Sequence, residues 1–325
     1  MRKFKVVLVS ALMLLATATG IFLLVAGHAK RKLRITNPAP GRMVDVGGYR
    51  LHIYCVGHGT PTVLFEAGMN DFSLHWSSVQ TLVAQKLRAC VYDRAGFGWS
   101  ETGHSATLEN RIADLEQLIE RTEIAKNGLI LVGHSYGGLM VRGFASRHPE
   151  QITGLVLVDS AHEDQFRRLP FMTALAHNTA DSFRSLRWLV DSGIMALSLE
   201  QIPDRGLPVD LAIQYRALLA STASLQTAAD ETDAAPLSFD WARGKNMALP
   251  RTIRLTVISR GRPDQMPGLS DSDNLLLEDE WNKLQASLTS LVPNARSIMA
   301  TKSRHYIQLD EPALVYSAIL EISAK

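Results

Sequence analysis

The most constraining feature of this sequence is a serine enclosed by glycines where a strand pattern meets a helix pattern. The apolar run Leu129–Val132 predicts a short buried strand, and Tyr136–Arg147 has the spacing of a helix. Between them stands Gly133-His134-Ser135-Tyr136-Gly137, followed by Gly138. The glycines permit a sharp turn that lifts Ser135 above the edge of a sheet. We therefore expect an α/β architecture around this turn.

The rest of the chain alternates the same two patterns. Short apolar runs predict strands at Thr62–Phe65, Ala89–Tyr92, Ile152–Val158, Ile253–Ser259 and Ala295–Met299. Helical spacing occupies Trp76–Leu87, Leu108–Ile124, Leu275–Leu291 and Pro312–Ile322. Two alternating runs around Gly47-Gly48, within residues 43–55, predict a β-hairpin. Alternating strands and helices predict a mostly parallel sheet covered by helices on both faces.

One long segment interrupts this alternation. Residues 161–250 lack a convincing strand pattern and favour short helices separated by prolines and glycines. We therefore predict one α/β core, residues 43–160 and 251–325, with residues 161–250 inserted as a helical cap. The apolar residues of the cap, such as Phe171 and Trp188, are expected to pack mostly on the core, with a fraction facing a cleft.

The N-terminal segment predicts a membrane anchor. Residues 6–27 form an uncharged stretch of 22 residues, which as a helix extends ~33 Å and can cross a bilayer core. Basic residues flank it on both sides, so its orientation is undetermined. The alternative is a cleaved signal peptide with Ala16-Thr17-Ala18 as the cleavage site, although the apolar run continues past it. Residues 1–34 form the predicted anchor, and residues 35–42, with two prolines and a glycine, form a linker.

Charge and cysteine content exclude several classes of protein. Residues 1–34 hold seven of the 34 Lys and Arg residues and no Asp or Glu, which leaves 27 basic against 32 acidic residues elsewhere. That balance argues against a nucleic-acid partner. Cys55 and Cys90 are too few for a disulfide framework or a four-cysteine zinc site, and they do not settle the compartment. The sequence does not indicate an oligomeric state.

Three segments together resemble the α/β-hydrolase superfamily, in its capped group of esterases, lipases, C–C hydrolases and epoxide hydrolases. They are the turn around Ser135, the segment Tyr92-Asp93-Arg94-Ala95-Gly96-Phe97-Gly98-Trp99-Ser100, and the late Ser303-Arg304-His305-Tyr306-Ile307. The resemblance covers about residues 44–323. Members that open epoxides or displace halide carry a carboxylate where this chain has Ser135, so the resemblance implies acyl transfer from a serine nucleophile instead.

The resemblance also supplies a base and an acid. His305 lies late in the chain, after a strand, and completes the order serine, acid, histidine; His162 is its rival. The acid, which orients the histidine, is expected at Asp264, in the loop after the strand Ile253–Ser259. Asp159, at the end of the preceding strand, is the alternative, and Asp271 and Asp273 are further candidates.

Two backbone N–H groups are expected to form an oxyanion hole. One belongs to Tyr136, the residue after the nucleophile. The other is expected at Met69, in Glu66-Ala67-Gly68-Met69-Asn70, where the family usually has His-Gly. The missing histidine leaves the backbone role in place but changes the loop. Asp93 and Arg94 are interpreted as braces of the loop after the fourth strand rather than as catalytic groups.

These features predict a membrane-anchored serine hydrolase, carboxylesterase-like, that cleaves an apolar ester through Ser135, His305 and an aspartate. Serine-dependent C–C hydrolases, lactonases, amidases and aminopeptidases use the same set of groups and remain alternatives. A different class, a hydrolase-like binding protein without turnover, is the third hypothesis. None of the enzymatic readings requires a metal or an organic cofactor.

Overall fold

One sheet organises the protein. The computed structural model describes residues 2–204, 206–245, 247–266 and 268–324, and within them the sheet has eight strands in the order β1-β2-β4-β3-β5-β6-β7-β8. The pairs β1–β2 and β2–β4 are antiparallel, and all other neighbours are parallel. The strands are β1 (Arg42–Asp45), β2 (Arg50–Val56), β3 (Thr62–Glu66), β4 (Ala89–Tyr92), β5 (Leu129–His134), β6 (Ile152–Val158), β7 (Leu255–Arg260) and β8 (Arg296–Ala300).

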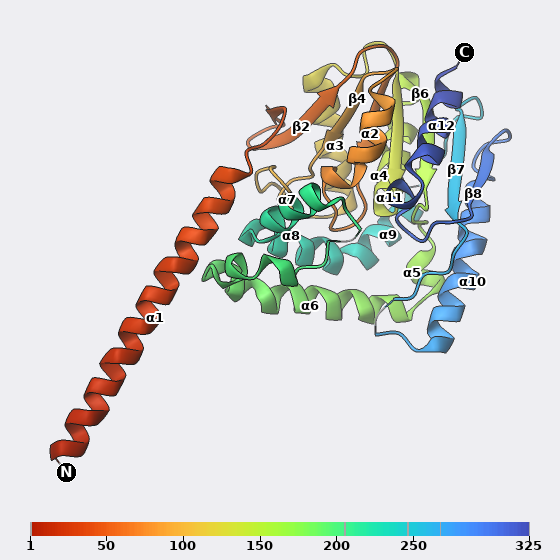
Figure 1. The fold of residues 1–325 in the computed structure, drawn as a ribbon. Coiled ribbons are helices and arrows are strands. Elements are labelled where there is room, and N and C mark those ends of the chain that lie inside the picture. The colour runs from red at the N-terminus through yellow and green to blue at the C-terminus, as the bar shows by residue number, and fades with distance from the viewer. Residues whose placement is uncertain (1, 205, 246, 267, 325) are drawn as a thin grey trace.

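Helices connect the strands and cover both faces of the sheet (Figure 1). The helices are α1 (Arg2–Thr36), α2 (Ser77–Val83), α3 (Leu108–Thr122), α4 (Tyr136–Arg147), α5 (Gln165–Arg168), α6 (Phe171–Asp191), α7 (Val209–Leu219), α8 (Thr222–Asp233), α9 (Ala235–Gly244), α10 (Asp271–Leu288), α11 (Ile307–Asp310) and α12 (Pro312–Ser323). Short 3-10 turns are η1 (Ser73–Trp76), η2 (Pro149–Gln151), η3 (Ile194–Leu197) and η4 (Leu199–Gln201). The predicted fold class, a mostly parallel α/β-hydrolase sheet flanked by helices, is confirmed.

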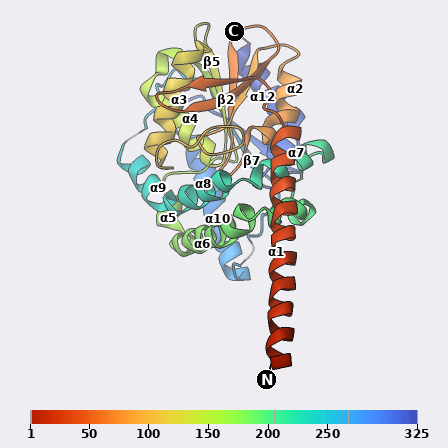
Figure 2. The same ribbon diagram turned by 90° about the vertical axis from the view of Figure 1, so that its left-hand side faces the viewer.

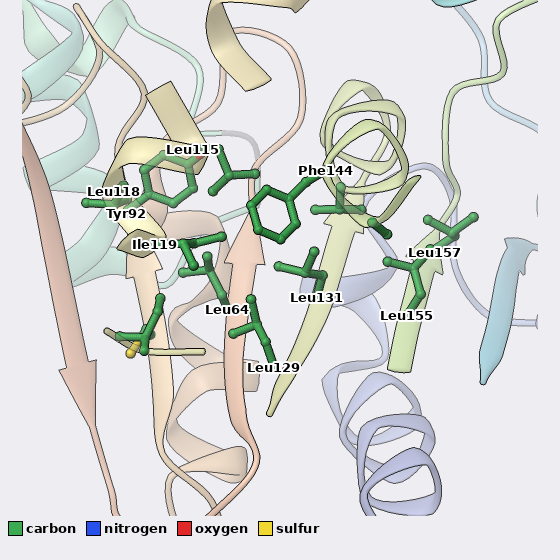
Figure 3. Packing of buried hydrophobic residues seen from close by; sticks show 14 of the residues in the cluster. Leu64, Tyr92, Leu115, Leu118, Ile119, Leu129, Leu131, Phe144, Leu155 and Leu157 are labelled. Atoms are coloured by element: carbon green, nitrogen blue, oxygen red, sulfur yellow. The ribbon is translucent and has the colours of Figure 1, made fainter. Parts of the chain in front are cut away.

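The central strands are apolar throughout because both of their faces are covered. Every residue of β3 and β5 is buried. On one face, Leu64, Leu131 and Leu155 pack against α3 and against Phe144 of α4, as Figure 3 shows. On the other face, residues such as Val63 and Val132 belong to a second cluster with α2 and α12. These two clusters fix the strand ends from which the candidate site is built.

The helices between β6 and β7, residues 161–250, are called the insertion below. They gather at one end of the sheet and run across it rather than alternating with strands (Figures 1 and 2). α1 leaves the protein on this same side, as a long helix whose N-terminus lies far from the sheet. α1 is long and apolar enough to cross a membrane, which fits either an anchor or a signal sequence.

A disulfide that the sequence analysis did not predict joins Cys55 and Cys90. The two cysteines face each other on the antiparallel strands β2 and β4, because the pairing register sets Cys55 opposite Cys90. The bond ties the antiparallel edge of the sheet to its parallel part.

Candidate active site

Ser135 lies at the sharp turn between β5 and α4. Its backbone has φ 51° and ψ −123°, a conformation that only a closely fixed residue keeps. A β-carbon on Gly133 would lie 2.6 Å from the carbonyl oxygen of Gly137, so the turn excludes a larger residue there. The Ser135 amide donates to the carbonyl of Val158, 3.1 Å away, and its carbonyl accepts from Gly138 and Ala161. The turn is thus fixed on both sides, with Ser135 at the end of the central strand.

His305 lies beside this turn, in the loop after β8, and is oriented by Asp159. The distance from His305 Nδ1 to Asp159 Oδ2 is 2.6 Å. Asp159 follows β6 directly and is fully buried, whereas the His305 side chain is 21% exposed. The backbone of Asp159 is itself fixed, since its amide donates to Ile258 of β7 at 2.7 Å. An aspartate in this position holds the proton on Nδ1 and leaves Nε2 to act as a base.

The expectation that Asp264 partners His305 is wrong in this geometry. Asp264 lies near this pair, but its carboxylate accepts a hydrogen bond from the neighbouring amide of Gln265 instead. The physical reason lies at the end of β7. Gly261 donates to Ala300 at 2.8 Å and Arg262 donates to Ser303, so the chain after β7 follows β8. His305 Nδ1 is already occupied by Asp159, the alternative acid. Asp271 and Asp273 begin α10, where Asp273 pairs with the cap residue Ser270.

Three donors stabilise the Asp159 carboxylate besides His305. Arg260 Nη1 lies 2.8 Å from Oδ2, Trp281 Nε1 lies 2.9 Å from Oδ1, and the amide of Arg260 lies 3.2 Å from Oδ1. Burial alone raises the pKa of Asp159, but the hydrogen bond from His305 and the charge of Arg260 hold that pKa well below its usual value. Asp159 is therefore ionised wherever the protein is folded near neutral pH.

A second histidine, His134, supports the loop of His305 through the backbone. His134 precedes Ser135, and its Nε2 lies 2.9 Å from the carbonyl oxygen of His305. The two rings pack with centroids 4.6 Å apart. Burial, and next the charge of His305, lower the pKa of His134 to about 3, so it is neutral and donates through Nε2. Its Nδ1 carries no proton and lies 3.8 Å from Asp71, whose carboxylate accepts from the Tyr306 hydroxyl. His162, the rival base, pairs with the insertion residue Glu163 instead.

The loop after β3 contains Met69, the expected second oxyanion donor, and Arg94 holds this loop in place. Arg94 donates to the carbonyl oxygens of Ala67, at 2.8 Å, and Gly68, at 2.7 Å. The Gly68 carbonyl belongs to the same planar peptide as the Met69 N–H, and in a trans peptide the two groups point in opposite directions. Fixing the carbonyl therefore fixes the direction of the Met69 N–H, which donates no hydrogen bond to the residues that the structure describes. Tyr136 is the first residue of α4, where an N–H has no intrahelical acceptor.

The insertion completes this arrangement through Glu231 of α8. Glu231 is fully buried and accepts from Arg94 Nε at 3.0 Å and Nη2 at 2.9 Å, a two-point contact. It also accepts from the amide of Asn70 at 3.0 Å and lies 3.2 Å from Arg111 Nε. On the other side, Arg94 Nη1 donates to Glu66 at 2.8 Å. A buried cluster of alternating charges thus joins the insertion to the loop of Met69.

Ser135 and His305 line one cavity of about 320 Å³ between the insertion and the sheet. Its walls are mainly apolar and come from the insertion and α10, with Phe166, Met172, Leu175, Phe239 and Leu277 among them. Met69 and Tyr136 line it as well. The expected nucleophile, base and oxyanion donors thus converge on one apolar space, as a small-molecule site requires.

The sequence analysis missed contacts between residues that are far apart in the sequence. Glu231 sits in a helix without any motif, and it meets Arg94 across 137 positions of sequence. Arg94 was interpreted as a brace, and it is one, but the loop that it braces is the one after β3. A buried arginine in a loop motif needs a carboxylate partner, which is a usable signal. The sequence offers no way to choose that partner, since α8 alone has three acidic residues, Asp230, Glu231 and Asp233.

A sheet of this order, with a serine at the end of β5 and a histidine–aspartate pair at the ends of β8 and β6, defines an α/β hydrolase. Residues 53–318 match the model of the Alpha/beta hydrolase family, and the chain belongs to this family.

Individual relatives match the chain only in part or at low sequence identity. The chain is 31% identical over 148 residues to a cis-3-alkyl-4-alkyloxetan-2-one decarboxylase of Shewanella oneidensis, covering 44% of this chain and 46% of the relative. It is 31% identical over 127 residues to a 2-hydroxy-6-oxo-2,4-heptadienoate hydrolase of Pseudomonas putida, covering 38% and 45%. The chain thus spans less than half the length of these two relatives. The Cif epoxide hydrolase of Acinetobacter nosocomialis superimposes with a TM-score of 0.68 at 13% identity, over 92% of this chain and 96% of that one.

Proposed function

We propose that the protein is a serine hydrolase that cleaves an ester-like acyl bond through Ser135, His305 and Asp159. The observation that carries the proposal is the 2.6 Å contact between Asp159 and His305 beside a serine held at a strained turn, all at one apolar cavity. A bare serine is a weak nucleophile, and a histidine with a fixed tautomer is the base that activates it.

In the first half-reaction, Ser135 Oγ attacks the carbonyl carbon of the ester while His305 Nε2 takes the hydroxyl proton. The carbonyl electrons move onto the oxygen, and the amides of Tyr136 and Met69 stabilise the oxyanion. The oxyanion then collapses, the bond to the leaving alcohol breaks, and His305 returns the proton to that alcohol. Water repeats the sequence on the acyl-enzyme and releases the acid, which restores Ser135.

The cavity supports an ester with an apolar acyl or alcohol part. Its lining includes three methionines, two phenylalanines and two leucines, and its volume of about 320 Å³ suits a small molecule. Arginines of the insertion do not favour a substrate carboxylate, because Arg167 and Arg184, for example, pair with acidic neighbours on the surface. Lactones belong in the same class, because the relative from Shewanella oneidensis is named for an alkyl-substituted oxetanone, which is a cyclic ester.

The apolar helix α1 supports an anchor in a membrane, with cleavage as a signal sequence the alternative. The disulfide Cys55–Cys90 supports a catalytic domain on the oxidising side of that membrane, since disulfides persist there and not in a reducing cytosol. C–C bond hydrolysis is a second candidate for the reaction. Its support is the similarity to the relative named as a 2-hydroxy-6-oxo-2,4-heptadienoate hydrolase.

The test is labelling of the full-length protein in detergent with a fluorophosphonate probe, beside Ser135→Ala and His305→Ala. We expect the wild type to be labelled, and both variants to be unlabelled while their circular dichroism matches the wild type. Hydrolysis of p-nitrophenyl esters from acetyl to decanoyl then tests the substrate class, and kcat/KM is expected to rise with chain length. A folded wild type that neither labels nor turns over any ester, lactone or dienoate would overturn the proposal in favour of a binding protein.

A further inference from the structure

α1 is not separate from the domain. It packs against the insertion at one defined position along its length, between Ala26 and Lys30. Ala26 is fully buried, although the residues around it on α1 are exposed. The backbone of Gly193, between α6 and η3, approaches it so closely that a β-carbon on Gly193 would lie 2.5 Å from the Ala26 carbonyl oxygen. One turn later, Lys30 Nζ donates to the carbonyl of Val190 at 2.9 Å, at the negative end of the α6 dipole. Backbone packing and charge thus hold α1 against the end of α6.

The position of this contact along α1 sets where the insertion lies relative to a bilayer that α1 spans. The uncharged stretch of α1 ends at Gly27, and four basic residues, Lys30, Arg31, Lys32 and Arg34, follow it. If α1 spans a membrane, the boundary between hydrocarbon and headgroups falls near residues 26–29, because charged side chains belong to the headgroup region. Gly193 touches Ala26, so this end of the insertion lies at the same boundary. Figures 1 and 2 agree, since α1 extends past the insertion and away from the sheet.

Apolar side chains are exposed on this end of the insertion, residues 186–197, which we call the insertion tip. Trp188 is 61% exposed, Leu186 is 40% exposed and Leu197 is 38% exposed. Exposed side chains of this size on neighbouring turns are costly in water. Tryptophan in particular favours the membrane–water interface, where its ring is buried and its N–H is hydrated.

We propose that the insertion tip docks into the headgroup region of the membrane that α1 crosses. The inference rests on the anchor in the proposed function, but not on the catalytic chemistry. Its occupant is the lipid surface rather than a protein, because the tip is continuous with α1 at the depth where α1 enters the bilayer. The docked tip fixes the orientation of the domain, with the insertion towards the bilayer and the antiparallel edge of the sheet away from it.

The experiment is fluorescence quenching of the full-length protein in nanodiscs made with phosphatidylcholine that carries bromine on its acyl chains. The described tryptophans other than Trp188 are buried or half-buried in the protein, which makes Trp188 the tryptophan most open to lipid. We expect quenching of the wild type, strongest with bromine near the headgroup, and at least a twofold loss of the quenched intensity in Trp188→Phe. The matched control is Trp241→Phe, because Trp241 lies on α9 against Arg147 and Lys245; it should leave the quenched intensity unchanged.

Equal quenching of the wild type and Trp188→Phe in nanodiscs that retain the protein would overturn the proposal. Recovery of the full chain outside the nanodiscs would overturn it too, together with the anchor. Fluorophosphonate labelling of Ser135 in the same sample reports on the catalytic proposal separately, because it needs neither the anchor nor Trp188. A second variant, Leu197→Asp, should also reduce the quenching if the tip is docked, and it leaves all five tryptophans in place.

Discussion

Replacing Asp159 by asparagine tests the site most sharply, because asparagine keeps the shape of the side chain and removes its charge. The Oδ2 atom of Asp159 accepts from both His305 Nδ1 and Arg260 Nη1, at 2.6 and 2.8 Å. An amide NH₂ group in that position would face two donors. His305 is then favoured in the other tautomer, with Nδ1 as acceptor and the proton on Nε2, where it can no longer take the proton of Ser135.

The expected losses in rate and stability differ in size. A wrong tautomer costs about 10⁴-fold in kcat, or about 5 kcal/mol of transition-state stabilisation. Removing one partner of a buried ion pair costs roughly 3–5 kcal/mol of folding free energy. The stability loss should lie at the lower end, because Arg260 keeps Glu278 as a partner at 2.8 Å. The variant should therefore remain folded at 25 °C while its turnover collapses.

The assay is ester hydrolysis under single-turnover and steady-state conditions, with thermal unfolding of each sample measured in parallel. Asp264→Asn is the matched control, because it makes the same change at a residue that lines the cavity but does not hold His305. We expect Asp264→Asn to stay within about threefold of the wild type. The reasoning is refuted if a folded Asp159→Asn keeps more than about a tenth of wild-type kcat, or if Asp264→Asn shows the collapse.

Three further outcomes are expected. Glu231→Gln should lower kcat about 10- to 100-fold with little change in KM, because Glu231 helps Arg94 to orient the proposed oxyanion donor. The control is Asp230→Asn at the exposed neighbouring residue, which should leave both kcat and KM unchanged. His134 is protonated below about pH 6.5 when unfolded and only near pH 3 when folded, so stability falls by about 2 kcal/mol between pH 7 and pH 5; denaturant titrations should show a smaller fall in His134→Gln. Reduction or Cys55→Ala/Cys90→Ala should lower the free energy of unfolding by up to about 4 kcal/mol, the loop-closure value for a sequence separation of 35, and intact mass under native conditions should show no free thiol.

The fold was predictable because its signals are local. Apolar runs in the sequence predict the central strands. The glycines around Ser135 predict the sharp turn of a strand-to-helix junction. Element ends shifted by a few residues where capping decides them. The helix predicted to begin at Leu275 begins at Asp271, because Ser270 caps it by accepting from the amide of Asp273. The Cys55–Cys90 disulfide required the register of β2 on β4, which no local pattern contains.

The acid illustrates what local signals leave open. Asp159 and Asp264 both follow strands that end at the same edge of the sheet, β6 and β7, so the topology admits either. The choice depends on which loop turns towards His305 and on where Arg260 and Trp281 place their donors. Those contacts join residues more than a hundred positions apart. Ser135 and His305, in contrast, each lie in a short motif of their own and can be predicted as candidates without any long-range information.

The charged cluster around Arg94 holds the proposed oxyanion loop in place without the family's usual histidine. Glu66, Arg94 and Glu231 come from β3, from the loop after β4 and from the insertion, and all three are fully or nearly fully buried. Each charge has a partner of opposite sign within hydrogen-bonding distance, which is the condition under which a buried charge is tolerated. A displacement of α8 away from the sheet would leave Arg94 without Glu231 and would release the Asn70 amide beside Met69. In the proposed mechanism the insertion therefore positions the oxyanion loop as well as forming a wall of the cavity. Truncating it should remove activity even with Ser135, His305 and Asp159 in place.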